Sequence, residues 1–337
     1  MLMIGVAAPE LAESEKRWLR APGVAGVLLF ARNYRSREQL MALCEAIRDA
    51  GGEHLLIAVD QEGGPVQRFR DGFTRLPPLA TIGAVYDRAP FDAIRLAEEH
   101  AWVMASELRA SGVDFSFAPV VDLARGNAAI GLRAFHADPA VAGELGQAYV
   151  RGMHLGGMAA VLKHFPGHGS VTGDTHKVAA IDPRGLDEIR RDDLRPFAEC
   201  IEARVEAVMM AHVTYPAVDS RPAGYSKVWI EQVLRGELGF TGAVISDDIS
   251  MAAADAAGSV GGRVRAHLDA GCDLVLACFP EVVDEALAAL PADAGAMPAS
   301  IAALRGAIGP TWAGLTDNPQ RDRFVARITA LPAEGNA

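Results

Sequence analysis

The sequence contains few cysteines, no basic run and no long apolar run, and each of these shortages excludes a class of protein. The four cysteines form no Cys-x-x-Cys pair, so they indicate neither a metal site nor a disulfide framework, and we expect reduced core thiols. The formal net charge of −11 argues against a nucleic-acid partner. No apolar run reaches the ~18 residues that cross a bilayer, so we expect no membrane partner.

The start of the chain lacks the composition of a secretion signal. Residues 1–8 are apolar without a basic leader, and Glu10, Glu13 and Glu15 follow where a cleavage site would be needed, so we expect a cytoplasmic protein. Half of the 337 residues are hydrophobic and 22% are charged, which is typical of a chain that folds around one large core. We expect a monomer that works without a cofactor or a metal ion.

Eight short runs of aliphatic and β-branched residues predict strands at 2–6, 26–30, 55–60, 115–120, 159–164, 207–212, 243–247 and 274–278. Their hydrophobicity is continuous, as in parallel strands that are buried on both faces. Apolar residues at helical spacing predict helices between them, at 37–50, 92–110, 139–154, 226–235, 263–270 and 281–289. This alternation predicts a single-domain TIM-type (β/α)8 barrel over residues 1–337, with an open doubly wound sheet as the alternative. From about residue 292 we expect a helical tail, with helices near 299–308 and 321–331.

Polar residues gather where the predicted strands end. Asp60 ends the third run, Lys163 and His164 end the fifth, His212 ends the sixth, and Asp247 ends the seventh. An unpaired charge adds nothing to the stability of a buried strand end, whereas the reactive groups of β/α barrels lie at the carboxyl ends of their strands. We therefore predict a functional site at this end of the barrel.

The segment 163–176 has the highest density of reactive side chains. It begins at a strand end and contains three glycines and a proline, so it cannot be a regular helix. Asp174 and His176 are two residues apart, and in extended backbone such side chains project to the same side, so the carboxylate can orient the imidazole. A histidine held in this way can donate a proton near neutral pH. We also expect this long loop to close over a bound ligand.

Three other interpretations of this segment remain open. His164 and His168 have the spacing of zinc ligands on a helix, although Pro166 and Gly167 deny the helix that this spacing needs. The glycines after a strand resemble a dinucleotide-binding loop, but the third glycine is displaced by one residue and no amphipathic helix follows. In the last interpretation the segment is a purely structural turn, with His176 a surface histidine.

Two further motifs contain candidate ligand-binding side chains. Adjacent strand residues face opposite ways, so only one of Asp247 and Asp248 can point into the barrel mouth, and we expect the other to cap the following turn. In the alternative, both aspartates serve the turn alone. Asp60 is followed by paired glycines, which let backbone approach a ligand closely, and by Arg68. Arg133 lies in a second loop, and either arginine could instead be an ordinary ion-paired surface group.

Together these segments resemble the family-three glycoside hydrolases, in particular the single-domain β-N-acetylglucosaminidases of bacterial peptidoglycan recycling. The resemblance is carried by residues 26–34, 60–64, 117–122, 163–176, 211–213 and 246–248. Its most specific part is Lys-His-Phe-Pro-Gly-His-Gly followed by Asp-x-His, which marks the N-acetylglucosaminidase branch of the family. The resemblance implies hydrolysis of terminal N-acetylglucosamine from muropeptides, with net retention through a covalent glycosyl-aspartate.

The resemblance also implies a role for each matching residue. It makes Asp247 the nucleophile, His176 the acid and base, and Asp174 the partner of His176. The residues that it assigns to sugar binding are Asp60, Arg68, Arg133, Lys163 and His164. Three positions depart from the family pattern and are left out of the predicted site, namely Pro65, Leu132 and His136. Two other activities fit the same residues: phosphorolysis of the same intermediate, and sugar binding without turnover.

Overall fold

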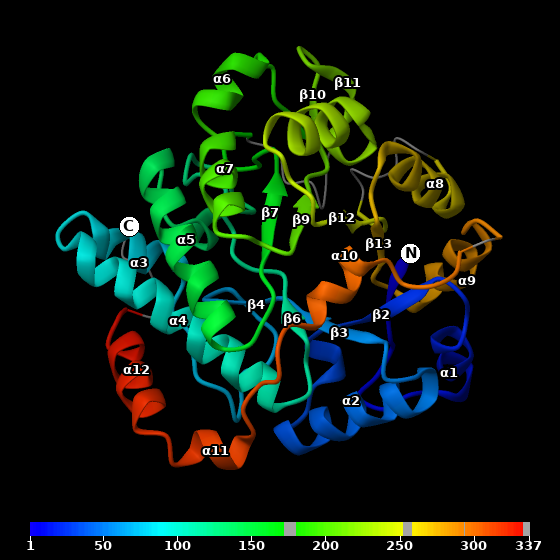
Figure 1. Ribbon diagram of the computed structural model, residues 1–337, viewed down its shortest axis with the longest axis horizontal. Helices are drawn as coiled ribbons and strands as arrows, with labels where there is room; N and C mark the ends of the chain where they lie inside the picture. The colour runs from blue at the N-terminus through cyan, green and yellow to red at the C-terminus, as the bar shows by residue number, and fades with distance from the viewer. Residues whose placement is uncertain (172–179, 252–257, 293, 333–337) are drawn as a thin grey trace.

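The computed structural model describes residues 1–171, 180–251, 258–292 and 294–332, and its centre is an eight-stranded parallel sheet (Figure 1). The strands are β1 (Leu2–Gly5), β2 (Val24–Leu29), β3 (Leu56–Val59), β6 (Phe115–Ser116), β7 (Val161–Phe165), β9 (Ala207–Met210), β12 (Ala243–Asp248) and β13 (Leu274–Ala277). Their order is β6-β3-β2-β1-β13-β12-β9-β7, and isolated parallel bridges join Phe115 to Ala159 and Val120 to Lys163. These bridges bring β6 beside β7 and close the barrel, which confirms the predicted fold class over the open sheet.

Helices surround the barrel, as Figure 1 shows. Before the tail they are α1 (Glu13–Leu19), α2 (Arg37–Gly51), α3 (Leu79–Tyr86), α4 (Pro90–Ala110), α5 (Pro139–Leu155), α6 (Leu186–Arg191), α7 (Leu194–Glu202), the π-helix η4 (Val228–Glu237), α8 (Val260–Ala270) and α9 (Pro280–Ala288). All residues of β1, β2 and β3 are buried, because these strands face the barrel interior on one side and helices on the other. The six helices predicted from apolar spacing are all present.

Local sequence signals fix where several helices begin and end. The Ser36 hydroxyl accepts a hydrogen bond from the Gln39 amide at 3.2 Å at the start of α2, and Ser259 accepts one from Gly262 at 3.2 Å at the start of α8. Helix α8 ends at Gly271, whose φ of 109° is a left-handed conformation that favours glycine. Short polar side chains and glycine therefore set the helix bounds that hold the strands in register.

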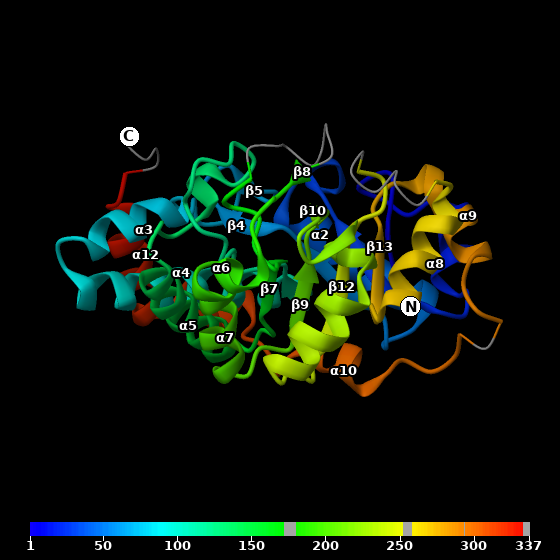
Figure 2. The ribbon, with the colours of Figure 1, turned by 90° about the horizontal axis from the view of Figure 1, so that it is seen from above.

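Smaller elements cover the carboxyl end of the barrel. They are the paired strands β4 (Gln61–Gly63) and β5 (Val66–Gln67), the sheet of β8 (Ala180–Ile181), β10 (Val213–Tyr215) and β11 (Asp219–Pro222), and the 3-10 helices η1 (Ala31–Asn33), η2 (Gly131–Arg133) and η3 (Ala223–Tyr225). In Figure 2, β5 and β8 lie toward the upper edge of the molecule and the tail helix α10 (Ala299–Ala302) lies at its lower edge. The two ends of the barrel are therefore covered by different parts of the chain.

The tail packs against the barrel helices. After α10 it contains η6 (Ala303–Arg305), α11 (Trp312–Thr316) and α12 (Pro319–Thr329). Helix α12 fits the expected helix near 321–331, whereas the expected helix at 299–308 ends at Arg305 because Gly306 adopts a φ of 64°. The Trp312 indole Nε1 donates to the Ser111 hydroxyl at 2.9 Å, and Arg321 pairs with Glu107 at 2.7 Å. These contacts tie the tail to α4.

All four cysteines are buried free thiols, as the sequence predicts. Burial raises the pKa of the Cys44 thiol to about 12, so this thiol stays protonated and unreactive. Within the described ranges, no helix combines the length and the apolar character that crossing a membrane requires.

Candidate active site

A cavity of about 560 Å³ lies at the carboxyl ends of the barrel strands. Every predicted site residue that the structure describes lines it, namely Asp60, Arg68, Arg133, Lys163, His164 and Asp247. Side chains from the ends of β3, β7 and β12 meet here, although they are far apart in the sequence. The volume falls within the ~300–1,000 Å³ of small-ligand pockets. The other two predicted residues, Asp174 and His176, lie outside the described residues.

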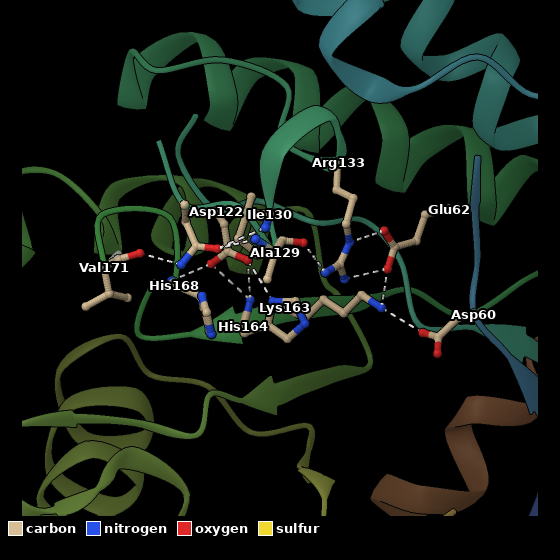
Figure 3. Close-up of polar contacts among 12 residues, drawn as sticks. Asp60, Glu62, Asp122, Ala129, Ile130, Arg133, Lys163, His164, His168 and Val171 are labelled. Carbon is tan, nitrogen blue, oxygen red and sulfur yellow. Dashed lines mark hydrogen bonds and ion pairs between the residues drawn. The ribbon is translucent and has the colours of Figure 1, made fainter. Parts of the chain in front are cut away.

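Lys163 is the centre of a buried charge network on one wall of the cavity (Figure 3). Its Nζ lies 2.8 Å from Oδ1 of Asp60 and 2.5 Å from Oε1 of Glu62. The Arg133 guanidinium donates two hydrogen bonds of 2.8 Å to the two oxygens of Glu62, which fixes the planes of both groups. Arg68 lies 3.7 Å from the other oxygen of Asp60. The network therefore presents fixed donors and acceptors to the cavity.

The network keeps both carboxylates ionised. Burial alone would raise the pKa of Glu62, but Arg133 and Lys163 outweigh it and lower this pKa to about 2. Burial likewise opposes ionisation of Asp60, and Lys163 with Arg68 holds the pKa of that carboxyl below its ordinary value. At neutral pH the wall therefore offers carboxylate acceptors and cationic donors side by side, which suits a ligand rich in hydroxyl groups.

His164 is oriented from behind by a buried carboxylate. Its Nδ1 lies 2.7 Å from Oδ2 of Asp122, so Nδ1 donates its proton to this carboxylate in a hydrogen bond. Asp122 also accepts the backbone N–H of His168 at 2.7 Å, which holds the start of the following loop. Burial and the neighbouring His164 lower the pKa of His168 to about 4, so His168 is neutral near pH 7. Across the described ranges, no three His, Cys, Asp or Glu side chains are placed to hold a metal ion.

The two aspartates at the end of β12 have different surroundings, although both line the cavity. Oδ1 of Asp248 accepts the Ser250 amide at 3.0 Å, so Asp248 caps the turn as expected of one member of the pair. Oδ1 of Asp247 accepts the adjacent Asp248 amide at 2.8 Å. His212, predicted at the end of a strand, is buried and donates from Nε2 to the Asp248 carbonyl at 3.0 Å. Asp248 therefore caps the turn, and Asp247 lines the cavity beside it.

Two charged residues of the site were missed by the sequence analysis. Glu62 lines the cavity only two residues beyond Asp60, and Asp122 lies behind His164. Both belong to segments that carry the family resemblance, and that position was the available signal. The paired glycines after Asp60 were misinterpreted: Gly63 and Gly64 have φ values of 100° and 52° and serve the β4–β5 turn, and neither lines the cavity.

The structure also shows where Arg133 and the three departures from the family pattern lie. Arg133 is not a surface group, because its guanidinium is buried against Glu62. The departures Pro65, Leu132 and His136 are not among the residues that line the cavity. His136 instead lies 3.2 Å from Asp87 on the outside of the barrel. These three side chains therefore lie outside the cavity that the described site residues share.

Comparisons with known proteins agree along the chain. Residues 1–302 match the glycosyl hydrolase family 3 N terminal domain. A beta-hexosaminidase of Stenotrophomonas maltophilia strain R551-3 is 60% identical over 94% of this chain and 94% of its own, and that of strain K279a is 60% identical over 97% and 98%. The structure of NagZ from Neisseria gonorrhoeae in complex with N-trifluoroacetyl-D-glucosamine superposes with a TM-score of 0.90 at 40% identity, covering 99% of this chain and 98% of that one.

Proposed function

The chain belongs to glycosyl hydrolase family 3, and from this premise we propose that it is a retaining exo-β-N-acetylglucosaminidase. Its substrate is a muropeptide derived from peptidoglycan, from which it removes the terminal non-reducing N-acetylglucosamine. The beta-hexosaminidases that are 60% identical to it support the sugar specificity. The observation that carries the proposal is that Asp247 and the Lys163 charge network line one cavity.

The charge network would bind the terminal sugar by its hydroxyl groups. Asp60 and Glu62 are ionised acceptors, and Lys163, Arg68 and Arg133 are donors that the carboxylates hold in place. Groups fixed in this way lose little entropy when they bind, so their hydrogen bonds favour one orientation of the sugar. A sugar held here by its non-reducing end directs its anomeric carbon toward the remaining carboxylate of the cavity, Asp247.

The reaction is a double displacement. An oxygen of Asp247 attacks the anomeric carbon while the bond to the leaving oxygen breaks and protonated His176 donates its proton to that oxygen. Water then attacks the glycosyl-aspartate, His176 takes the proton of the water, and the sugar leaves with its original anomeric configuration. Asp174 orients His176. The roles of His176 and Asp174 rest on the sequence resemblance.

Three further parts of the proposal rest on no contact in the cavity, and only the first of them is implied by the resemblance. They are the muropeptide as natural substrate, a cytoplasmic location, and action as a monomer. The absence of a cofactor is part of the same proposal, because each reaction step uses a carboxylate, an imidazole or water.

The decisive experiment compares wild type with Asp247→Asn on aryl N-acetyl-β-glucosaminides, with NMR of the first-formed anomer. We expect the β anomer first from wild type, and a loss of at least about a thousandfold in kcat for the variant. A first-formed α anomer, or a variant that keeps its activity, would contradict the proposal. Added phosphate is a second arm, because a phosphorylase would form sugar 1-phosphate faster as phosphate rises, whereas the hydrolase would not.

His176 has its own test, based on leaving groups that need no proton. We expect His176→Ala to reduce turnover of a disaccharide far more than turnover of an activated aryl glycoside, because a stabilised phenolate departs unprotonated. Equal losses on both substrates would contradict the role of proton donor. Wild type measured on both substrates in parallel gives the reference ratio.

A further inference from the structure

The cavity has a second wall that the proposed mechanism does not use. It contains Phe30 just after β2 and Phe279 just after β13, above the apolar side chains Leu28 and Leu276. None of the residues predicted for the site belongs to this wall. Going round the barrel, the charged wall occupies the ends of β7 and β3, the apolar wall those of β2 and β13, and Asp247 ends the next strand, β12. The nucleophile therefore stands beside the apolar wall and faces the charged one.

The two phenylalanine rings pack against each other at the rim of the cavity. Their ring centroids are 6.4 Å apart with an angle of 23° between the planes, which is a stacked arrangement. Phe279 is 44% exposed, so a large part of its ring is not packed against the protein. An exposed aromatic side chain beside a ligand cavity offers apolar contact area that core packing does not explain.

Arg32 and Asn33 fix the positions of the rings. The Arg32 guanidinium lies 4.3 Å from the centre of the Phe30 ring and 5.3 Å from that of Phe279. It donates from Nη2 to the Cys278 carbonyl at 2.6 Å and from Nε to the Val6 carbonyl at 3.0 Å, which joins the ends of β13 and β1. Oδ1 of Asn33 accepts the Phe30 amide at 2.9 Å and closes the η1 turn. The rings are therefore held in place before any ligand binds.

The segment 26–34 forms part of this wall. It carries part of the family resemblance but contributed no predicted site residue. The segment supplies the Phe30 ring, the Arg32 guanidinium over it, and the Asn33 side chain that fixes the turn. Arg32 and Asn33 hydrogen-bond backbone carbonyls at the ends of β1 and β13, and the same two residues hold Phe30 at the rim of the cavity. The structure thus separates the part of the segment that forms β2 from the part that shapes the cavity.

Resting on the proposed function, we infer that Phe30 and Phe279 form the subsite for the leaving group, where the sugar ring next to the scissile bond stacks. With the terminal sugar on the charged wall and its anomeric carbon at Asp247, the leaving oxygen and its ring extend toward the opposite wall. The C–H face of a pyranose is apolar and flat, which matches an aromatic platform. Arg32 is a positioning residue, because it acts through the two rings.

The test is Phe279→Ala measured on two substrates with alkoxide leaving groups of different size. One is a β-linked N-acetylglucosamine disaccharide, and the other is methyl N-acetyl-β-glucosaminide, whose methyl group is too small to reach the rings. We expect kcat/KM to fall about tenfold for the disaccharide and to stay within about twofold for the methyl glycoside. Inhibition by free N-acetylglucosamine, which occupies the charged wall, should not change. Phe91→Ala, which removes an 84% exposed ring from the start of α4, is the matched control.

Phe279→Leu keeps an apolar side chain without the aromatic face, and we expect an intermediate loss confined to the disaccharide. Equal losses on the two substrates would overturn the inference, and so would weaker inhibition by N-acetylglucosamine. A changed preference for the length of the N-acyl chain, without a change in leaving-group preference, would assign the wall to the acetamido group instead and also overturn it. Wild-type protein that cleaves neither substrate would contradict the proposed function, whereas an active wild type without selective loss contradicts only the subsite.

Discussion

Two clusters of buried charge lie at opposite ends of the barrel, and they differ in what remains available to a ligand. At the amino end of β6, Asp114 accepts Arg48 at 3.2 Å, Arg109 at 3.0 Å and Arg305 at 3.3 Å, as well as the Ile57 amide at 2.8 Å. All of these partners come from the protein, and they join two helices, the tail and β3. The hydrogen bonds of this cluster therefore stabilise the amino end of the barrel.

The second cluster, at the carboxyl ends, is built from the same kinds of side chain with a different outcome. Asp60 has Lys163 at 2.8 Å but Arg68 only at 3.7 Å, and its side chain is 19% exposed against 2% for Asp114. Its members line the cavity, whereas Asp114 does not. Burial of charge therefore does not by itself identify a site. A site is identified by its position at the carboxyl ends of the strands, as expected of β/α barrels, and by charged groups that remain accessible to a ligand.

The largest effect that this contrast predicts is on activity, for Lys163→Met. We expect kcat/KM on an aryl N-acetyl-β-glucosaminide to fall at least about a thousandfold, because the sugar loses a charged donor and Asp60 loses its partner. Circular dichroism would confirm that the variant is folded at the assay temperature. Lys227→Met, at an exposed position, is the control. A folded Lys163 variant with nearly normal kcat/KM would remove the distinction between the clusters.

Asp114→Ala should give the converse result. Removing the carboxylate leaves the buried guanidinium groups of Arg48 and Arg109 without their partner, so we expect the free energy of unfolding to fall by about 3–4 kcal/mol. Urea unfolding measures this loss, with exposed Asp49→Ala on α2 as the control. The kcat/KM of the folded variant should stay within about twofold. A large change in kcat/KM at a temperature where the variant is fully folded would connect the two ends of the barrel.

Glu62→Gln tests the charge network through the pH dependence of the stability of the protein. The folded pKa of Glu62 is depressed from 4.5 to about 2, so its ionisation stabilises the fold above pH 4.5, and this contribution is lost as the pH falls toward 2. We expect the free energy of unfolding of wild type to exceed that of the variant by on the order of 3 kcal/mol at pH 7. This difference should shrink as the pH falls from 4.5 to 2. Denaturant unfolding at several pH values tests this, with exposed Glu53→Gln as reference. A difference that does not change with pH would contradict it.

The smallest predicted effect is at Arg305, at the edge of the Asp114 cluster. Arg305 makes one contact of 3.3 Å with Asp114 and one of 2.8 Å with the Leu55 carbonyl, and it is partly exposed. We expect Arg305→Gln to lower the free energy of unfolding by about 1 kcal/mol, which is about 2 °C in Tm, and to leave kcat/KM unchanged. Arg323→Gln, at an exposed position of α12, should do neither. Differential scanning calorimetry separates the two variants.

The sequence predicted the strand ends more accurately than the connections. Its eight apolar runs are the eight barrel strands, and the polar residues that end three of them line one cavity. Connections were harder because their hydrogen bonds go to distant partners. The paired glycines after Asp60 carry a turn signal and a ligand-approach signal at once, and only the observed φ values decided for the turn. Helix α11 has five residues, too few for a periodic pattern to be recognised.

The amino-acid sequence by itself determined the barrel, the family resemblance and the side chains that end at the functional face, because hydrophobic continuity and strand-end polarity are local properties of the chain. Only the tertiary structure decided that Glu62 pairs with Arg133, 71 residues away, and that Phe30 stacks with Phe279 across the rim. Such pairs depend on the register of neighbouring strands and on closure of the barrel, and neither is encoded within a single segment.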